Sequence, residues 1–126
     1  MHALVIDDSK SIRTILARIL LGVGFTVEEA ATGLEAMDLM KKEKVDLALV
    51  DWNMPDMDGC QFIREVRKNN AYKDIRMMMV TTETAISKVA EALDAGADEY
   101  IMKPFTKEMI LEKLVLMGMN ISNTAP

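Results

Sequence analysis

The chain has 126 residues, 50% of them hydrophobic and 28% charged, and its formal net charge is −5. These values indicate one globular domain and exclude a disordered chain, while the acidic balance without a basic cluster argues against direct nucleic-acid binding. No apolar run approaches the roughly 18 residues of a membrane span, and the amino terminus lacks a secretory signal, so we expect a soluble, cytoplasmic protein with a protein partner.

Five strand-like segments alternate with five helix-like segments along the chain. We expect strands near residues 3–7, 26–30, 46–51, 76–81 and 98–102. We expect helices near residues 10–21, 33–43, 59–69, 84–95 and 106–118. Three of the strands are almost continuously apolar, as strands covered on both faces are. Single helices between strands imply right-handed crossovers, so the fold class is α/β, a (βα)5 doubly wound parallel five-stranded sheet.

Turn and capping residues mark several of these boundaries. Thr32 and Glu35 form a capping box at the start of the second helix, and Gly96 ends the fourth helix. We therefore assign residues 1–119 to one domain and residues 120–126 to a flexible tail.

Three other features are expected to be structural. Cys60 is the single cysteine, and on a helix face it is expected to be a small buried hydrophobe rather than a nucleophile. The 12 methionines, including Met77 to Met79, are expected to fill the core. His2 lies outside any ligand pattern and is expected to be an ordinary residue near the terminus.

Acids, a threonine and a lysine each stand at the carboxyl end of a separate apolar run. The residues concerned are Asp7 and Asp8 after the first run, Asp51 after the third, Thr81 after the fourth and Lys103 after the fifth. The carboxyl ends of parallel strands meet at one edge of the sheet, where open α/β sheets place their sites. Three carboxylates, a hydroxyl and an ammonium at this edge indicate a site for a divalent cation and a phosphoryl group.

The order of these residues resembles that of a response-regulator receiver domain, over nearly the whole chain. The matching elements are Asp7-Asp8, Asp51 with Met54-Pro55 and Asp58-Gly59, Thr81, and Lys103-Pro104-Phe105. The resemblance implies a flavodoxin-like fold with strand order 2-1-3-4-5. It also implies a cis peptide bond before Pro104, whereas most bonds of this kind are trans.

The resemblance assigns a metal site and a phosphoacceptor. It implies that Asp8, Asp51 and the backbone carbonyl of Asn53 bind Mg²⁺ directly and that Asp7 binds it through water. Asp51 is the expected nucleophile, because a carboxylate can attack phosphorus and form an aspartyl phosphate. The alternative for any one of these acids is a turn or capping role.

The resemblance also assigns a switch. The Thr81 hydroxyl and the Lys103 ammonium are expected to contact the phosphate only after transfer. Tyr100 is then expected to occupy the space that Thr81 vacates, which changes the surface formed by the fourth helix, fifth strand and fifth helix. Candidate partner contacts on that surface are Ile86, Val89, Leu93, Lys107 and Lys113. The alternative is that the apolar members simply face the sheet.

Three residues beside the site are expected to tune the lifetime of the phosphorylated state. Asn53 and Glu83 occupy positions that influence how water reaches the acyl phosphate, so a short-lived state is expected. Thr82 is larger than the Ala or Gly that usually follows the threonine, and it is expected to narrow access for a phosphodonor or water.

The leading functional hypothesis is a stand-alone, monomeric response regulator. A sensor histidine kinase would donate the phosphate. A downstream protein would receive the signal, and a flagellar switch protein in chemotaxis is one candidate. A phosphatase is a further candidate partner. One alternative is a phosphate sink or relay without its own output. Another is a metal-dependent phosphatase with an Asp nucleophile, but such sites usually carry a second Asp where this chain has Asn53. We therefore expect no enzyme activity beyond self-catalysed phosphorylation and dephosphorylation.

Overall fold

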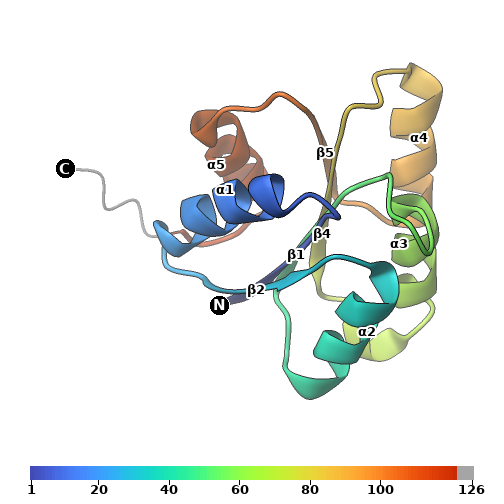
Figure 1. The fold of residues 1–126 in the computed structure, drawn as a ribbon, viewed down its shortest axis with the longest axis horizontal. Coiled ribbons are helices and arrows are strands. Elements are labelled where there is room, and N and C mark those ends of the chain that lie inside the picture. The colour runs from blue at the N-terminus through green and yellow to red at the C-terminus, as the bar shows by residue number, and fades with distance from the viewer. Residues whose placement is uncertain (122–126) are drawn as a thin grey trace.

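A parallel sheet with helices on both faces forms the described part of the chain, residues 1–121 of a computed structural model (Figure 1). Its strands are β1 (His2–Ile6), β2 (Thr26–Ala30), β3 (Leu47–Val50), β4 (Arg76–Thr81) and β5 (Glu99–Met102). Its helices are α1 (Lys10–Leu21), α2 (Gly33–Lys42), α3 (Gly59–Arg67), the short 3₁₀ helix η1 (Asn70–Tyr72), α4 (Ile86–Ala95) and α5 (Lys107–Leu116). The strands are parallel in the order β2-β1-β3-β4-β5, which confirms the predicted fold class and strand order.

The predicted element bounds agree with the structure to within two residues at most ends. The largest differences are at α4, which begins two residues later than expected, at α3 and α5, which each end two residues earlier, and at η1, which the sequence pattern did not predict. The residue before α4 is Ala85, whose side chain cannot accept a capping hydrogen bond, so the helix lacks a polar start signal. In contrast, Asn69 caps η1 by accepting a hydrogen bond from the amide of Ala71.

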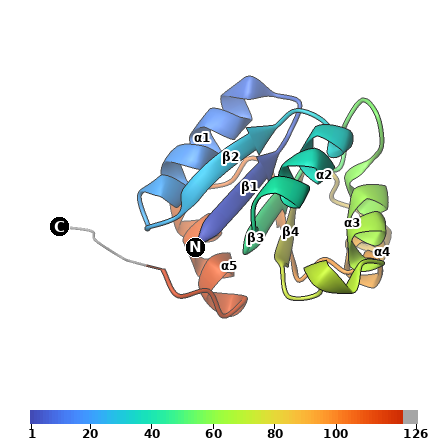
Figure 2. The ribbon, with the colours of Figure 1, turned by 90° about the horizontal axis from the view of Figure 1, so that it is seen from below.

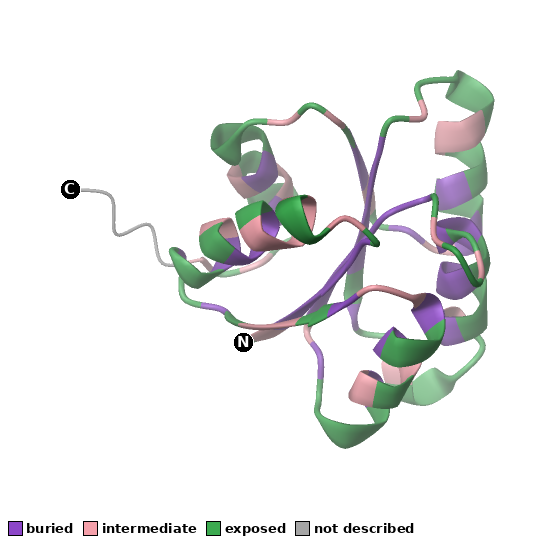
Figure 3. Ribbon diagram, viewed as in Figure 1, coloured by how far each residue is buried: buried purple, intermediate pink, exposed green. Residues whose placement is uncertain are grey.

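The core lies in two layers, one on each side of the sheet. Helices α1 and α5 cover one face, and α2, α3 and α4 cover the other (Figures 1 and 2). Successive residues of a strand point to opposite faces: Met77 and Met79 belong to the layer under α2, α3 and α4, whereas Met78 belongs to the layer under α1 and α5. Strands β1, β3 and β4 are buried along most of their length, whereas the edge strand β2 is mostly not (Figure 3). The core roles predicted for these methionines and for Cys60 are confirmed, but the same prediction is wrong for Met1, Met102 and Met109, which are exposed.

Two acceptors secure the start of α2. The Thr32 hydroxyl accepts a hydrogen bond from the amide of Glu35 at 3.1 Å, as the predicted cap requires. The carboxylate of Asp56, in the loop between β3 and α3, accepts from the amides of Gly33 at 3.1 Å and Leu34 at 2.9 Å. The loop that follows Asp51 is thereby tied to a neighbouring helix.

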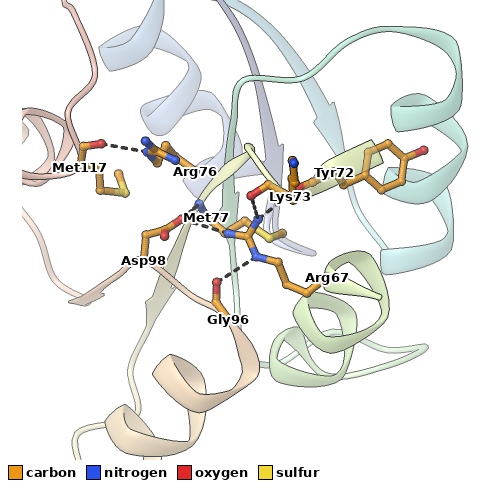
Figure 4. A network of polar contacts seen from close by, with 8 residues as sticks. All are labelled: Arg67, Tyr72, Lys73, Arg76, Met77, Gly96, Asp98 and Met117. Atoms are coloured by element: carbon orange, nitrogen blue, oxygen red, sulfur yellow. Dashed lines mark hydrogen bonds and ion pairs between the residues drawn. The ribbon is translucent and has the colours of Figure 1, made fainter. Parts of the chain in front are cut away.

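A second tie joins the end of α3 to two other segments (Figure 4). The guanidinium of Arg67 donates to the carbonyl oxygens of Gly96, Tyr72 and Lys73 at 3.0, 3.1 and 3.2 Å. It also contacts the carboxylate of Asp98 at 3.0 Å. This single side chain therefore holds α3, η1 and the connection between α4 and β5 together.

The end of the chain is described only in part. Residues 122–126 of the predicted tail lie outside the described residues, and the domain division at residue 119 stays a prediction. Ile121, which the tail prediction included, packs against the core layer under α1 and α5. In the stretch from residue 1 to residue 121, no helix has the length and apolar character needed to cross a lipid bilayer.

Candidate functional site

The carboxyl ends of β1, β3, β4 and β5 meet at one edge of the sheet. The ladder continues one residue past the strands, because the amide of Asp51 donates to the carbonyl of Ile6 at 2.9 Å and the amide of Lys103 donates to that of Thr81 at 2.8 Å. Strand pairing thus places the acids, the threonine and the lysine predicted from the sequence side by side. The Lys103–Pro104 peptide bond is cis, as the resemblance implied.

Three carboxylates and one ammonium form the centre of this edge. Carboxylate oxygens of Asp7, Asp8 and Asp51 lie within 4.8 Å of one another. Asp7 and Asp51 are only 2% and 6% exposed, whereas Asp8 is exposed. The Lys103 Nζ lies 2.8 Å from Asp7 Oδ2 and 3.5 Å from Asp51 Oδ1. One ammonium therefore faces two buried acids, and a third acid lies beside them at the rim.

This arrangement changes the acidity of Asp51. Burial, and then the charge of Asp7, raise the pKa of Asp51 to about 6, although Lys103 and the amide of Asn53 act to lower it. Burial together with Asp7 therefore outweighs the neighbouring ammonium. Clustered carboxylate oxygens are the ligands that a hard divalent cation such as Mg²⁺ prefers, so the residues fit such an ion.

Asp7 is held in place by the start of α1. Its Oδ1 accepts a hydrogen bond from the amide of Ser9 at 2.9 Å. The guanidinium of Arg13 donates to the backbone carbonyl of Asp7 at 2.7 Å and contacts Glu29 at 3.1 Å. The sequence reasoning did not single out Arg13, although a cation one turn into the helix after an acidic pair is the pattern that would have indicated it.

Thr81 and Tyr100 both contact the residue Glu83 in this structure. The fully buried Thr81 hydroxyl accepts from the amide of Glu83 at 3.3 Å, and the Tyr100 hydroxyl donates to the carbonyl of Glu83 at 2.7 Å. Burial, followed by the charge of Glu83, raises the pKa of Tyr100. Of the other residues predicted to tune the site, Asn53 and Thr82 are both exposed.

The residues predicted for the partner surface divide into two groups. Ile86 is 86% exposed and Leu93 is 48% exposed, so neither is fully accounted for by packing on the sheet. Val89 is partly buried against the core, as the alternative reading expected. Lys113 pairs with Glu99 at 3.0 Å, and Lys107 is exposed.

Two contacts were not foreseen from the sequence. The Nζ of Lys88 on α4 lies 4.9 Å from the ring centroid of Trp52, which follows Asp51 directly, so α4 touches the site loop through a cation–π contact. His2 also differs from its expected ordinary role, because its imidazole lies among the carboxylates of Glu28 and Glu43. Both contacts join residues that are distant in the chain, and neither has a local sequence signal.

Comparison with known proteins identifies the family of this chain. Residues 3–115 match the response regulator receiver domain family. A curated relative, the chemotaxis protein CheY homolog of Campylobacter jejuni, is 44% identical over 116 residues, which cover 90% of this chain and 89% of the relative. The solved chemotaxis response regulator CheY4 of Vibrio cholerae is 38% identical with a TM-score of 0.87, covering 92% of this chain and 97% of that chain.

A further solved structure bears on the chemistry of the family. A response regulator protein from Burkholderia pseudomallei, solved with a phosphorylated aspartic acid, a calcium ion and citrate, is 32% identical with a TM-score of 0.79. The similarity covers 87% of this chain and 64% of that chain. With the fold, the edge of polar residues and these relatives in agreement, the chain belongs to the response regulator receiver domain family of signalling proteins.

Proposed function

We propose that this protein is a response regulator that is phosphorylated on Asp51 and signals by binding another protein. The observation that carries the proposal is the carboxylate of Asp51, which is buried beside Asp7 and faces the ammonium of Lys103. A buried carboxylate with a raised pKa, next to a cation and two further acids, is a perturbed group of the kind that marks functional sites.

The chain supplies a nucleophile, ligands for a metal ion, and a cation that can pair with the new phosphate. An oxygen of Asp51 forms a bond to phosphorus while the bond from phosphorus to the donor's histidine nitrogen breaks. Asp8, Asp51 and the carbonyl of Asn53 would hold Mg²⁺ directly, and Asp7 would hold it through water. When bound, this ion would neutralise charge on the phosphoryl oxygens. Lys103 is close enough to Asp51 to pair with the new phosphate.

Transfer is proposed to change the surface around α4, β5 and α5. The Thr81 hydroxyl would leave the amide of Glu83 and donate to a phosphate oxygen. Tyr100 would then move into the space beside Thr81, which requires its hydrogen bond to the carbonyl of Glu83 to be remade. The phosphate can shift this equilibrium only by the extra stability that it gives to the second state.

The proposed partners follow from this surface and from the relatives. A sensor histidine kinase would donate the phosphate, and a downstream protein would contact the exposed Ile86 and Leu93. The Campylobacter jejuni and Vibrio cholerae relatives are chemotaxis proteins, so we place this protein in chemotaxis, in the cytoplasm, as a monomer with a flagellar switch as its target. A phosphatase is a further proposed partner, which would shorten the signal.

Fluorescence of the single tryptophan, Trp52, offers a direct test. Mg²⁺ is titrated first and a small phosphodonor second, in the wild type and in Asp51→Asn. We expect a saturable response to Mg²⁺ and then a second change that Asp51→Asn abolishes. If neither addition alters the emission and no phosphate is incorporated, the acids are structural and the proposed function is wrong.

A second measurement separates signalling from a phosphate sink. Binding to a purified flagellar switch protein is measured for the wild type before and after phosphorylation, and for phosphorylated Ile86→Ser. Stronger binding after phosphorylation, weakened by Ile86→Ser, would support an output surface on α4. Equal binding of both phosphorylation states would favour the relay role instead.

A further inference from the structure

A second group of potential metal ligands lies at the opposite edge of the sheet from Asp51. His2 begins β1, Glu28 lies in β2, and Glu43 is the residue that caps the end of α2. The His2 Nε2 lies 2.9 Å from Glu43 Oε2 and 3.5 Å from Glu28 Oε1. Because β1 runs from His2 toward Asp7, the length of the strand separates this group from the proposed phosphorylation site.

The imidazole of His2 is oriented by contacts on its other side. Its Nδ1 lies 2.6 Å from Thr26 Oγ1, on the residue that pairs with His2 in the sheet. The backbone amide of His2 donates to Asp46 Oδ2 at 2.8 Å. The His2 side chain is only 16% exposed, whereas those of Glu28 and Glu43 are 37% and 57% exposed. A fixed imidazole therefore faces two carboxylates that have room to adjust.

The hydrogen bonds assign the tautomer of His2. Thr26 Oγ1 lies 3.5 Å from the carbonyl of Met1, to which it can donate its proton. Its oxygen then accepts from Nδ1, so we assign the ring proton to Nδ1. In the neutral imidazole, Nε2 consequently presents a lone pair to two carboxylates. A lone pair and two negative groups at these distances need a cation between them, either a proton or a metal ion.

We propose that His2 Nε2 and the carboxylates of Glu28 and Glu43 bind a Zn²⁺ ion. Zn²⁺ binds imidazole nitrogen and carboxylate oxygen at about 2.0–2.2 Å, so neighbouring ligand atoms of a tetrahedral site are about 3.3 Å apart. The two nitrogen–oxygen distances here, 2.9 and 3.5 Å, lie on either side of that spacing. Histidine ligands of metals commonly donate their other ring N–H to an oxygen, as Nδ1 does here toward Thr26.

The donor set separates this site from the proposed Mg²⁺ site. Mg²⁺ prefers oxygen ligands only, whereas an imidazole with two carboxylates suits zinc and related transition metals. Three protein ligands leave one tetrahedral position for water or for a group from a partner. Bound metal would join the end of α2 to the first two strands of the sheet.

The test is a zinc titration of the full chain carrying Asp8→Asn and Asp51→Asn, which removes two acids of the other cluster. His2 is the only histidine, so its two ring nitrogens give a single set of NMR signals. We expect one Zn²⁺ per chain by calorimetry, with the Nε2 signal shifting on binding and Nδ1 remaining protonated. His2→Gln and Glu43→Gln in the same background should each weaken binding at least about tenfold.

One matched pair of variants and one control variant complete the design. Thr26→Val removes the oxygen that orients the imidazole and should weaken zinc binding about tenfold, whereas Thr26→Ser keeps it and should bind as before. Glu112→Gln removes an exposed carboxylate on α5 and should leave binding unchanged. Zinc binding that His2→Gln does not alter, or an Nε2 signal that does not move in millimolar Zn²⁺, would overturn the proposal.

Discussion

Asp51 is the residue whose environment most affects the energetics of the site. Its pKa, about 6 in the folded protein, lies above the value near 4 expected in the unfolded chain. Between these two values the folded state holds the proton more firmly than the unfolded state does. The contribution of Asp51 to stability therefore falls as pH rises from about 4 to about 6, and above that range the ionised group destabilises the metal-free fold.

The first prediction follows from the direction of this pKa shift. In EDTA, Asp51→Asn should be more stable than the wild type by roughly 1–2 kcal/mol at about pH 8, and the difference should shrink toward about pH 4. Urea unfolding at both pH values measures it. Asp38→Asn changes an exposed carboxylate of α2 in the same way and serves as the control. A variant that gains no stability at the higher pH would contradict the raised pKa.

The second prediction concerns access to the same carboxylate. Thr82 is exposed and directly follows Thr81 at the site edge, and its branched side chain is predicted to narrow the approach. Thr82→Ala should therefore speed phosphorylation from a small phosphodonor several-fold, as measured by the rate of the Trp52 fluorescence change. Thr84→Ala, which truncates another exposed threonine nearby, should not. An unchanged rate in Thr82→Ala would show that the Thr82 side chain does not limit access to Asp51.

At the level of elements, the start of α2 depends on a residue of the site loop. Burial acts to raise the pKa of Asp56, but hydrogen bonds from the amides of Leu34 and Gly33 outweigh it and hold that pKa below its usual value. A carboxyl of this kind stabilises the fold at pH values above its ordinary pKa. This stabilisation is lost as the pH falls through the folded-state pKa.

The third prediction is the effect of removing this cap. Asp56→Ala should lower stability by about 1 kcal/mol at neutral pH, and the loss should diminish below about pH 4. Asp56→Asn retains one acceptor oxygen and should lose less. Thermal unfolding across the pH range provides the measurement. Equal stability of Asp56→Ala and the wild type at neutral pH would show that Thr32 alone secures the helix.

The fourth prediction concerns the tie at the end of α3. Lysine cannot reproduce the forked geometry with which Arg67 reaches Gly96, Tyr72 and Asp98, so Arg67→Lys should cost about 2 kcal/mol in urea unfolding. Arg64→Lys is a matched control, because Arg64 lies on the same helix and its ion pair with Asp94, at 3.5 Å, is more exposed to solvent. Similar small losses in both variants would reduce the Arg67 network to an ordinary surface contact.

The helices and strands could be predicted from the sequence because the spacing of apolar residues and the capping residues indicate the same element boundaries. Thr32 and Gly96 are examples: each marks a helix end without reference to the rest of the fold. The start of α4 was placed too early because Ala85 gives no such signal. The site residues were predicted for a related reason, since parallel strands bring their carboxyl ends together whatever the loops do.

Contacts across elements were beyond the sequence reasoning. Asp56 reaches α2, Arg67 reaches the connection before β5, and Lys88 reaches Trp52. His2 gained two acidic neighbours only once β2 and the end of α2 were placed beside it. Each of these pairings depends on how whole elements pack, and no spacing within the chain encodes it.

At the scale of the whole molecule, metal binding should be visible as stability. A ligand that binds only the folded state, at a hundred times its dissociation constant, adds about 2.7 kcal/mol. The fifth prediction is that Mg²⁺ raises the thermal unfolding temperature of the wild type and that Asp8→Asn and Asp51→Asn each reduce the rise. Asp38→Asn should respond like the wild type. If Mg²⁺ does not change the unfolding temperature of the wild type, the proposed ion site is wrong.

The contact between Lys103 and Asp7 also has a consequence for how the protein is made. The two residues lie 96 positions apart, and β5 joins the sheet through β4 alone among the described strands. Chains are synthesised from the amino end, so a ribosome-bound chain that has reached only β4 contains Asp7 and Asp51 but not yet that ammonium. The proposed phosphate site is therefore complete only after residue 103 has been made, so a shorter chain cannot present this ammonium to a phosphate.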